Sequence, residues 1–213
     1  MSSAAPAPAA ITDPQVDRIV RQAREHLFAH GYSSCTMDHL ATELGISKKT
    51  LYVHFASKDE LMLAVIEQLG REIRAEAEAL IANRELNFAE KLRGFAEGMA
   101  ERMSRLQPHA IRDLQRFAPH LHQRVVEMRQ RNIPYVFGRF IEEGQLAGRV
   151  RTDIDVAFAV EFYLQAMQGI FQSGTLERLK LAPRDVKARA LDLFFGGLLT
   201  PAGRKEHEKS FNH

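Results

Sequence analysis

Apolar residues in the first part of the chain recur in a short block with helical spacing. The members of this block are Val16, Ile19, Val20, Ala23, Leu27 and Phe28. Positions three, four and seven apart share one face of an α-helix, so these residues predict an amphipathic helix. Asp13 is suited to cap its start, Pro14 to its first turn and Gly31 to its end.

Two shorter helices and a long one are predicted next. Thr36 begins the second helix, and Gly45 ends it. The buried face of that helix is predicted to hold Met37, Leu40, Ala41 and Leu44. Ser47 begins a third helix with Leu51 and Phe55 on one face. The third helix must end near Ala56, because Ser57-Lys-Asp-Glu60 is a capping box that opens a fourth helix, from Lys58 to about Ala82.

The rest of the chain continues with helical patterns broken by proline and glycine. Asn87-Phe-Ala-Glu90 is a second capping box, and Pro108 and Pro119 separate two further helical segments. Asp153 or Asp155 can cap a helix that continues to about Leu179. Pro183 and Gly196-Gly197 bracket a final helix. We find no convincing strand and no repeat, so the sequence predicts an all-α protein with a compact head up to about residue 56.

Composition narrows the class of protein without naming a partner. The 213 residues include 45% hydrophobic residues, enough for a sizeable core. Lys and Arg (29) nearly balance Asp and Glu (27), so bulk charge does not indicate nucleic-acid binding. No apolar run approaches the roughly 20 residues of a membrane span, and the opening residues lack the pattern of a secretory signal. We therefore expect a cytoplasmic protein that does not enter a membrane.

The second and third helices, joined by a turn at Gly45, have the arrangement of a helix-turn-helix. In that motif the second helix lies in the major groove of DNA while the first crosses the backbone. With Leu51 and Phe55 buried, other faces of the third helix carry Lys48, Lys49, Tyr52 and Val53. Two cations and a phenol are groups that a DNA duplex can bind.

The stretch from Gly31 to Leu61 resembles the DNA-binding domain of the TetR/AcrR family of transcriptional regulators. It reads Gly31-Tyr-Ser-Ser-Cys-Thr-Met-Asp-His-Leu-Ala-Thr-Glu-Leu-Gly-Ile-Ser-Lys-Lys-Thr-Leu-Tyr-Val-His-Phe-Ala-Ser-Lys-Asp-Glu-Leu61. The threonine before the second helix, Ala-x-x-x-Gly-x-Ser, Thr-Leu-Tyr and Phe-x-Ser-Lys-x-x-Leu all occur in register, and the resemblance covers roughly residues 14–66. Lys49 and the Val53-His54 pair depart from the residues common in the family, which leaves the operator sequence open.

The resemblance implies a DNA-contacting surface. Residues implied to touch phosphates are Thr36, Tyr52, His54 and Lys58, those implied to approach base edges are Lys48, Lys49 and Val53, and Ser47 and Thr50 belong to the same surface. Simpler structural roles remain open at this stage. Tyr52 could pack between helices, Thr36 could serve only as a cap, and Lys58 could be a solvated surface charge.

The resemblance also implies a helical effector-binding and dimerisation bundle after the head. The predicted organisation is a flexible arm (1–12), a three-helix DNA-binding domain (13–56), a helical bundle (57–200, of which 57–66 also supports the head) and a C-terminal tail (201–213). The last two long helices are expected to pair in a homodimer, even without DNA, and the dimer is expected to bind operator DNA. An apolar or amphipathic effector is expected to contact Met99, Met103, His109, Phe117, Phe137, Phe140, Phe162, Gln165 and Met167.

Histidines raise a rival interpretation as a metal-dependent helical enzyme. His26 and His30 could share a helix face, but we identify no third ligand in the sequence, whereas His120 and His122 point to opposite sides of a helix. Cys35 is expected to be a small neutral filler. We therefore expect no catalytic residue, metal or cofactor, and a DNA-binding repressor released by an effector. An activator or an effector-independent regulator is the alternative within the same class.

Overall fold

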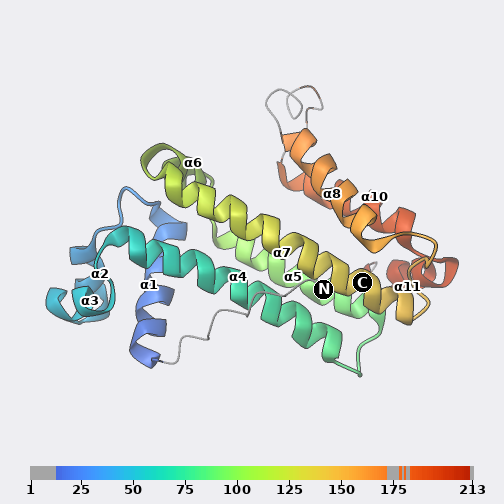
Figure 1. Cartoon of the computed structure of the whole chain (residues 1–213), viewed down its shortest axis with the longest axis horizontal. Helices are drawn as coiled ribbons and strands as arrows, with labels where there is room; N and C mark the ends of the chain where they lie inside the picture. The colour runs from blue at the N-terminus through green and yellow to red at the C-terminus, as the bar shows by residue number, and fades with distance from the viewer. Residues whose placement is uncertain (1–12, 172–177, 179, 181–182, 212–213) are drawn as a thin grey trace, which may run out of the picture. The chain divides into compact units, whose positions relative to one another are not determined.

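The described part of the chain folds mainly into helices. The computed structural model describes all residues except 1–12, 172–177, 179, 181–182 and 212–213. The helices are α1 (Pro14–His30), α2 (Met37–Leu44), α3 (Lys48–His54), α4 (Lys58–Ala82), α5 (Phe88–Arg105), α6 (Pro108–Phe117), α7 (Pro119–Leu146), α8 (Val156–Phe171), α10 (Pro183–Leu198) and α11 (Pro201–Phe211) (Figure 1). In the described residues the only β pairing is an isolated bridge between Val150 and Leu199, so the predicted all-α fold is confirmed.

Local capping signals set where several helices begin. Asp13 accepts a hydrogen bond from the Gln15 amide at 2.8 Å and caps α1. Asn87 and Glu90 cap reciprocally: the Glu90 amide donates to Asn87 Oδ1 at 3.0 Å, and the Asn87 amide donates to Glu90 Oε2 at 2.8 Å. Of the two aspartates considered for α8, Asp155 is the cap, because its Oδ1 accepts from the Phe158 amide at 2.7 Å. The predicted starts of these helices are confirmed.

The residues divide into two compact units, and α4, α5 and α7 each contribute to both. The first unit comprises Met1–Leu69 and Arg102–Met128. Its core brings residues of α1 to α4 together with Leu114, Ala118, Leu121 and Met128. The helix-turn-helix therefore shares one hydrophobic core with a segment that follows it much later in the chain.

The second unit comprises Gly70–Glu101 and Arg129–His213. Its core is rich in aromatic rings: Phe137 stacks on Tyr163 with centroids 4.7 Å apart, and the Phe194 centroid lies 5.0 Å from that of the same tyrosine. Helices α8 and α10, which supply two of these rings, lie side by side (Figure 1). Residues 57–69 and 102–128 of the bundle predicted over 57–200 belong instead to the first unit.

The tail expected beyond residue 200 is instead a helix, α11. Thr200 Oγ1 accepts from the Gly203 amide at 3.1 Å, which gives the helix a side-chain cap directly before Pro201. Glu206 of α11 pairs with Arg149 and accepts from the Ala89 amide at 3.2 Å. The pair Thr200-Pro201 is a signal in the sequence for the start of α11, but the contacts that hold this helix in place come from distant residues.

Two further expectations lie outside the described residues: the arm over 1–12 and the extension of α8 towards Leu179. The functional boundary between 13–56 and 57–200 stays a prediction.

Candidate DNA-binding site

The turn between α2 and α3 has the backbone geometry of a helix-turn-helix. Thr36 caps α2 by accepting from the His39 amide at 3.1 Å. Gly45 ends α2 in the left-handed conformation, with φ 66° and ψ 30°, which glycine adopts at little cost. Ser47 then caps α3, accepting from the Thr50 amide at 3.0 Å. Short-range hydrogen bonds thus fix both ends of the turn.

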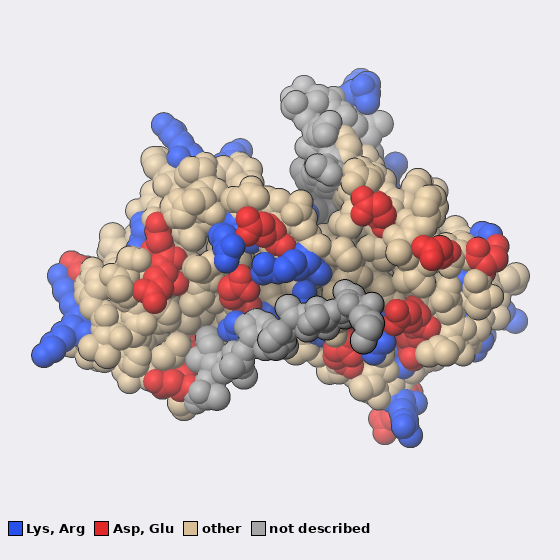
Figure 2. All heavy atoms as spheres, in the orientation of Figure 1, with Lys and Arg blue, Asp and Glu red and all other residues tan. Residues whose placement is uncertain are grey.

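Helix α3 buries one side and exposes the other. Leu51 is fully buried and Phe55, directly after the helix, is 6% exposed. Tyr52 and Val53 are 48% and 75% exposed, and Lys48 and Lys49 are also exposed. Lys and Arg side chains project from the surface over α2 and α3 (Figure 2). Tyr52 therefore does not pack between helices as a core residue would, and the outward face of α3 is open to a partner.

Polar side chains around α3 have partners within the same unit. Lys48 Nζ donates to Asp38 Oδ2 at 2.5 Å, and the two side chains are 62% and 60% exposed. The hydroxyls of Ser47 and Thr50 lie 2.8 Å apart. An exposed ion pair contributes only about 0–1 kcal/mol, so DNA phosphates or bases can displace Asp38 from Lys48 at small cost. His54 is half-buried in the last turn of α3.

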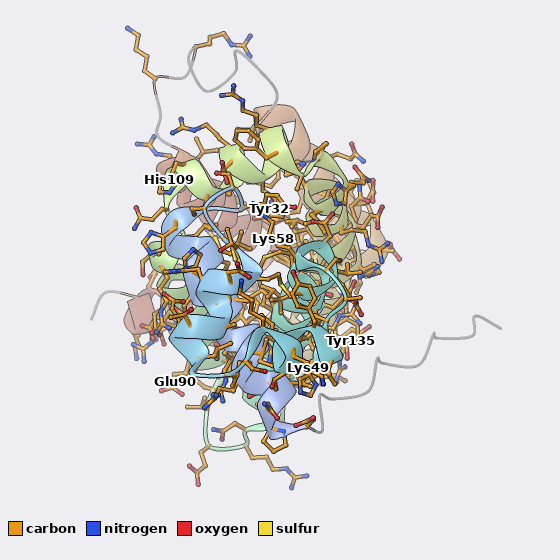
Figure 3. All side chains as sticks on the ribbon, turned by 90° about the vertical axis from the view of Figure 1, so that its left-hand side faces the viewer. Tyr32, Lys49, Lys58, Glu90, His109 and Tyr135 are labelled. Carbon is orange, nitrogen blue, oxygen red and sulfur yellow. The ribbon has the colours of Figure 1, made fainter. Side chains whose placement is uncertain are left out.

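Lys58 is held more firmly than the lysines of α3. Its Nζ donates to the Tyr32 carbonyl at 3.0 Å and lies 3.7 Å from the centroid of the Tyr32 ring. Figure 3 shows Tyr32 and Lys58 side by side, whereas Lys49 lies apart from them. Lys58 is thus not a solvated surface charge, and its implied phosphate contact stays a prediction.

The tyrosine that binds Lys58 belongs to a short chain of hydrogen bonds. Its hydroxyl donates to Asp59 Oδ1 at 2.5 Å, and Asp59 Oδ2 lies 2.7 Å from His120 Nε2. Burial and this bond to the carboxylate raise the pKa of Tyr32 to about 12. The Tyr32 hydroxyl is in turn the main reason that the pKa of Asp59 is below its ordinary value, with His120 and Lys58 adding to the effect.

Helix α6 is tied to the loop that precedes α2. Asp113 accepts from the amide of Ser33 at 2.6 Å and from its hydroxyl at 2.8 Å. Burial acts to raise the pKa of Asp113, but the hydrogen bonds from Ser33 outweigh it and hold the pKa below its ordinary value. Gly31, with φ 85°, packs so closely on Asp113 that an added Cβ would lie 2.7 Å from Oδ2. Sequence patterns do not reveal this contact, because Ser33 and Asp113 are 80 positions apart.

The predicted effector residues do not gather in one described site. Met103, His109 and Phe117 belong to the first unit, and the other six belong to the second. Phe140 is 2% exposed in the second core, whereas Phe162 is 61% exposed and stacks on Phe158. A described surface hollow of about 390 Å³ is lined by Leu199, Pro201, Arg204, Lys205 and Glu208. None of these lining residues is a predicted effector residue, so the effector site stays a prediction.

Cys35 and the histidines of α1 lie in the same unit as α3. Cys35 is fully buried, and burial raises the pKa of its thiol to about 11, which agrees with the expected role as a neutral core residue. The sequence pattern offers no third ligand beside His26 and His30, but in the structure His39 and Glu43 lie against His26. Only the packing of α1 on α2 reveals this cluster.

No helix within the described part of the chain is long and apolar enough to cross a membrane.

Comparison with known proteins agrees with this geometry. A sequence profile described as "Bacterial regulatory proteins, tetR family" matches residues 19–65, which run from α1 into α4. The HTH-type transcriptional regulator UidR of Escherichia coli strain K12 is 26% identical over 197 residues, which cover 88% of this chain and 94% of UidR. The uncharacterized HTH-type transcriptional regulator YvaF of Bacillus subtilis strain 168 is 34% identical over 84 residues, which cover 39% of this chain and 44% of YvaF.

A solved structure extends the similarity to the whole fold. The structure of a SmeT–triclosan complex superposes with a TM-score of 0.58 at 18% identity, and the match covers 89% of this chain and 93% of that one. The similarity in fold thus includes the helices beyond the profile match. Residues 19–65 therefore match the helix-turn-helix domain of the tetR family, and the chain as a whole is similar in sequence to an HTH-type transcriptional regulator and in fold to SmeT.

Proposed function

We propose that this protein is a homodimeric cytoplasmic repressor that leaves a palindromic operator when a small apolar or amphipathic molecule binds it. The observation that carries the DNA-binding part is the exposed face of α3. This face presents Lys48, Lys49, Tyr52 and Val53 around a firmly buried Leu51. A rigid helix with cations and an apolar side chain on its outer face is suited to the major groove.

The residues of the predicted DNA-contacting surface divide into two proposed roles. Lys48, Lys49 and Val53 approach base edges, where lysine donates to guanine acceptors and valine contacts a thymine methyl group. Thr36, Tyr52, His54 and Lys58 contact phosphates, with Ser47 and Thr50 on the same surface. The capping bond of Thr36 uses one oxygen lone pair, so its hydroxyl proton is still available to a phosphate. The Ser47 and Thr50 hydroxyls lie 2.8 Å apart, and one donates to the other, which leaves one proton of the pair for a phosphate.

The dimer is supported by an apolar surface on α8 and α10. Phe158, Phe162 and Leu193 are 68%, 61% and 80% exposed. Large apolar side chains exposed together on neighbouring helices are typical of a protein interface. A two-fold dimer would present two copies of α3 to successive major grooves, about 34–36 Å apart, which is why a palindromic operator is expected.

Release by an effector is supported by the way that helices pass between the two units. Residues of α4 and of α7 belong to both units, so a displacement within the second unit can reach the first along continuous helices. In the first unit, Asp113 of α6 is bonded directly to Ser33 beside the helix-turn-helix. SmeT, whose fold this chain shares, has been solved in complex with triclosan, so this fold can hold a small molecule.

The DNA-binding proposal is tested by selecting bound sequences from random duplexes and measuring affinity for the selected site. Lys49→Ala and Val53→Ala should weaken binding to the selected site by about 1–3 kcal/mol each and change the preferred base at one position per half-site. Lys58→Ala should weaken binding to selected and random DNA alike and lower the salt slope by about one. Arg151→Ala, in the second unit, is the control. Unchanged affinity in both α3 variants would place the DNA-binding surface elsewhere.

The dimer is tested by sedimentation of the protein without DNA. Phe162→Glu combined with Leu193→Glu should convert the dimer to a folded monomer, because both side chains are exposed within the chain but would bury charge in the proposed interface. Met103→Glu, at an exposed position of α5, is the matched control. A double variant that remains dimeric would place the interface elsewhere.

A further inference from the structure

Two helices of the first unit bring histidine and carboxylate side chains together. Helix α1 carries His26 and His30, four residues apart, and α2 carries His39 and Glu43 with the same spacing. Where the helices meet, the His26 and His39 rings have centroids 5.0 Å apart. One potential ligand atom from each of His26, His39 and Glu43 lies within 4.8 Å of the other two. The cluster thus joins two elements that sequence spacing alone would not pair.

Glu43 is the centre of this cluster. Its Oε1 lies 3.1 Å from His39 Nε2, and its Oε2 lies 3.7 Å from His26 Nδ1. Gln22 Nε2 donates to the same Oε2 at 3.1 Å and fixes the orientation of the carboxylate. Gln22 is the main reason that the pKa of Glu43 is below its ordinary value, and the two histidines add to that effect. The carboxylate is therefore ionised near neutral pH.

The His26 ring has a buried nitrogen without a hydrogen-bond partner. Its side chain is 6% exposed, and its Nε2 is buried without a hydrogen-bond partner. The distance from Nδ1 to Glu43 is too long for a hydrogen bond. Buried polar atoms nearly always have a partner, and an exception calls for an explanation such as an ion. An imidazole nitrogen that carries no proton can donate its lone pair to a metal ion.

We propose that His26, His39 and Glu43 form a binding site for a divalent transition-metal ion, with Zn²⁺ the best match. Two imidazoles and one carboxylate are a frequent zinc ligand set, whereas Mg²⁺ and Ca²⁺ prefer oxygen ligands throughout. Tetrahedral Zn²⁺ with bonds of about 2.0–2.2 Å holds its ligand atoms roughly 3.3 Å apart. The 3.1 Å from Glu43 Oε1 to His39 Nε2 and the 3.7 Å from Oε2 to His26 Nδ1 lie on either side of that spacing. The three ligand atoms, which lie within 4.8 Å of one another, would draw closer around an ion.

The remaining coordination position is left to water or to His30. The His30 ring centroid lies 4.8 Å from that of His26, on the same helix. An ion held in this way links α1 to α2, the helix that precedes the turn and α3. Metal binding is therefore expected to stabilise the first unit, and it does so whether or not the protein is a ligand-released repressor.

The test uses the full-length protein without an affinity tag, stripped of metal with a chelator and titrated with Zn²⁺ by calorimetry. We expect one ion per chain and a dissociation constant of about 1 μM or lower. His39→Ala and Glu43→Gln should each weaken binding at least tenfold. Both side chains are partly exposed, so both variants should retain the helical circular dichroism of the parent. His109→Ala, an exposed histidine of α6, is the matched control and should bind as the parent does.

Thermal unfolding with and without Zn²⁺ separates a loss of metal binding from a loss of folding in the variants. Zn²⁺ should raise the midpoint of thermal unfolding of the parent and of His109→Ala but not of His39→Ala or Glu43→Gln. The proposal is overturned if the parent binds no Zn²⁺ up to about 100 μM, or if both cluster variants bind as tightly as the parent. Binding that is lost only with His120→Ala or His122→Ala would equally overturn it, because it would place the ion on α7.

Discussion

Removing the Lys58 side chain should destabilise the first unit, because its ammonium has two partners inside the protein. Nζ donates to the Tyr32 carbonyl at 3.0 Å and lies 3.7 Å from the centroid of the Tyr32 ring. A hydrogen bond from a charged donor contributes about 1.5–3 kcal/mol, and a cation over an aromatic ring contributes about 0.5–2 kcal/mol. Both contacts are made by the same half-buried ammonium group of Lys58, so their two free-energy contributions do not simply add. We therefore expect Lys58→Ala to lower the free energy of unfolding by about 2 kcal/mol.

Urea denaturation followed by far-ultraviolet circular dichroism measures this loss. For a urea dependence of about 2 kcal/mol per molar, the midpoint of Lys58→Ala should fall by about 1 M. Lys49→Ala is the matched control, because it removes the same charge from an exposed position of α3 and should change stability by less than about 0.5 kcal/mol. Equal midpoints for Lys58→Ala and Lys49→Ala would refute the assignment of a structural role to the Tyr32 contacts.

Three further substitutions test other contacts of the two units. The pKa of Asp59 is lowered, chiefly by the Tyr32 hydroxyl, so its contribution to stability is present above the unfolded pKa of about 3.9 and is lost as pH falls through the lower folded value. The Asp59 side chain is 43% exposed, so Asp59→Asn should lower the free energy of unfolding by less than about 1 kcal/mol. As the pH is lowered from about 5 to 2, the urea midpoint of Asp59→Asn should fall less steeply than that of the parent, and parallel curves would contradict this. Lys91 has a side chain that is 7% exposed, and it donates to Glu143 and to the Ile81 carbonyl. Lys91→Ala should therefore lower the free energy of unfolding by about 3 kcal/mol and the thermal midpoint by roughly 6–12 °C, and a shift below about 2 °C would show that the ion pair contributes little to stability. Gly203→Ala would push a Cβ into the Arg149 carbonyl, so amide exchange in α11 should quicken, and parental exchange rates would refute that packing.

The helices could be predicted from the sequence because their boundaries depend on residues close together in the chain. Asp13 and Pro14 begin α1, and the Asn87–Glu90 capping box begins α5. Each signal involves residues within one helical turn, so its effect does not depend on the tertiary structure. The exposed face of α3 was predictable for the same reason, because burying Leu51 and Phe55 fixes which side chains point outward.

Contacts between distant residues could not be predicted in this way. Asp113 and Ser33 are 80 positions apart, and nothing in either residue type specifies the other. His39 and Glu43 became candidate ligands only when α2 was seen against His26. Phenylalanines show the same limit: Phe140 is 2% exposed and Phe162 is 61% exposed, although both occur in apolar helical patterns. Whether such a residue belongs to a core, a ligand site or an interface depends on neighbours that helical periodicity does not encode.

The first unit is discontinuous along the chain, which limits the order in which it can form during translation. Its core joins Leu40 and Leu51 to Leu114 and Leu121, and its residues extend to Met128. A ribosome completes α3 long before it supplies α6, so the nascent head must wait with part of its apolar surface uncovered. A chain that ends within α5 would lack Leu114 and Leu121, and would leave the apolar residues that they cover in the first unit open to water.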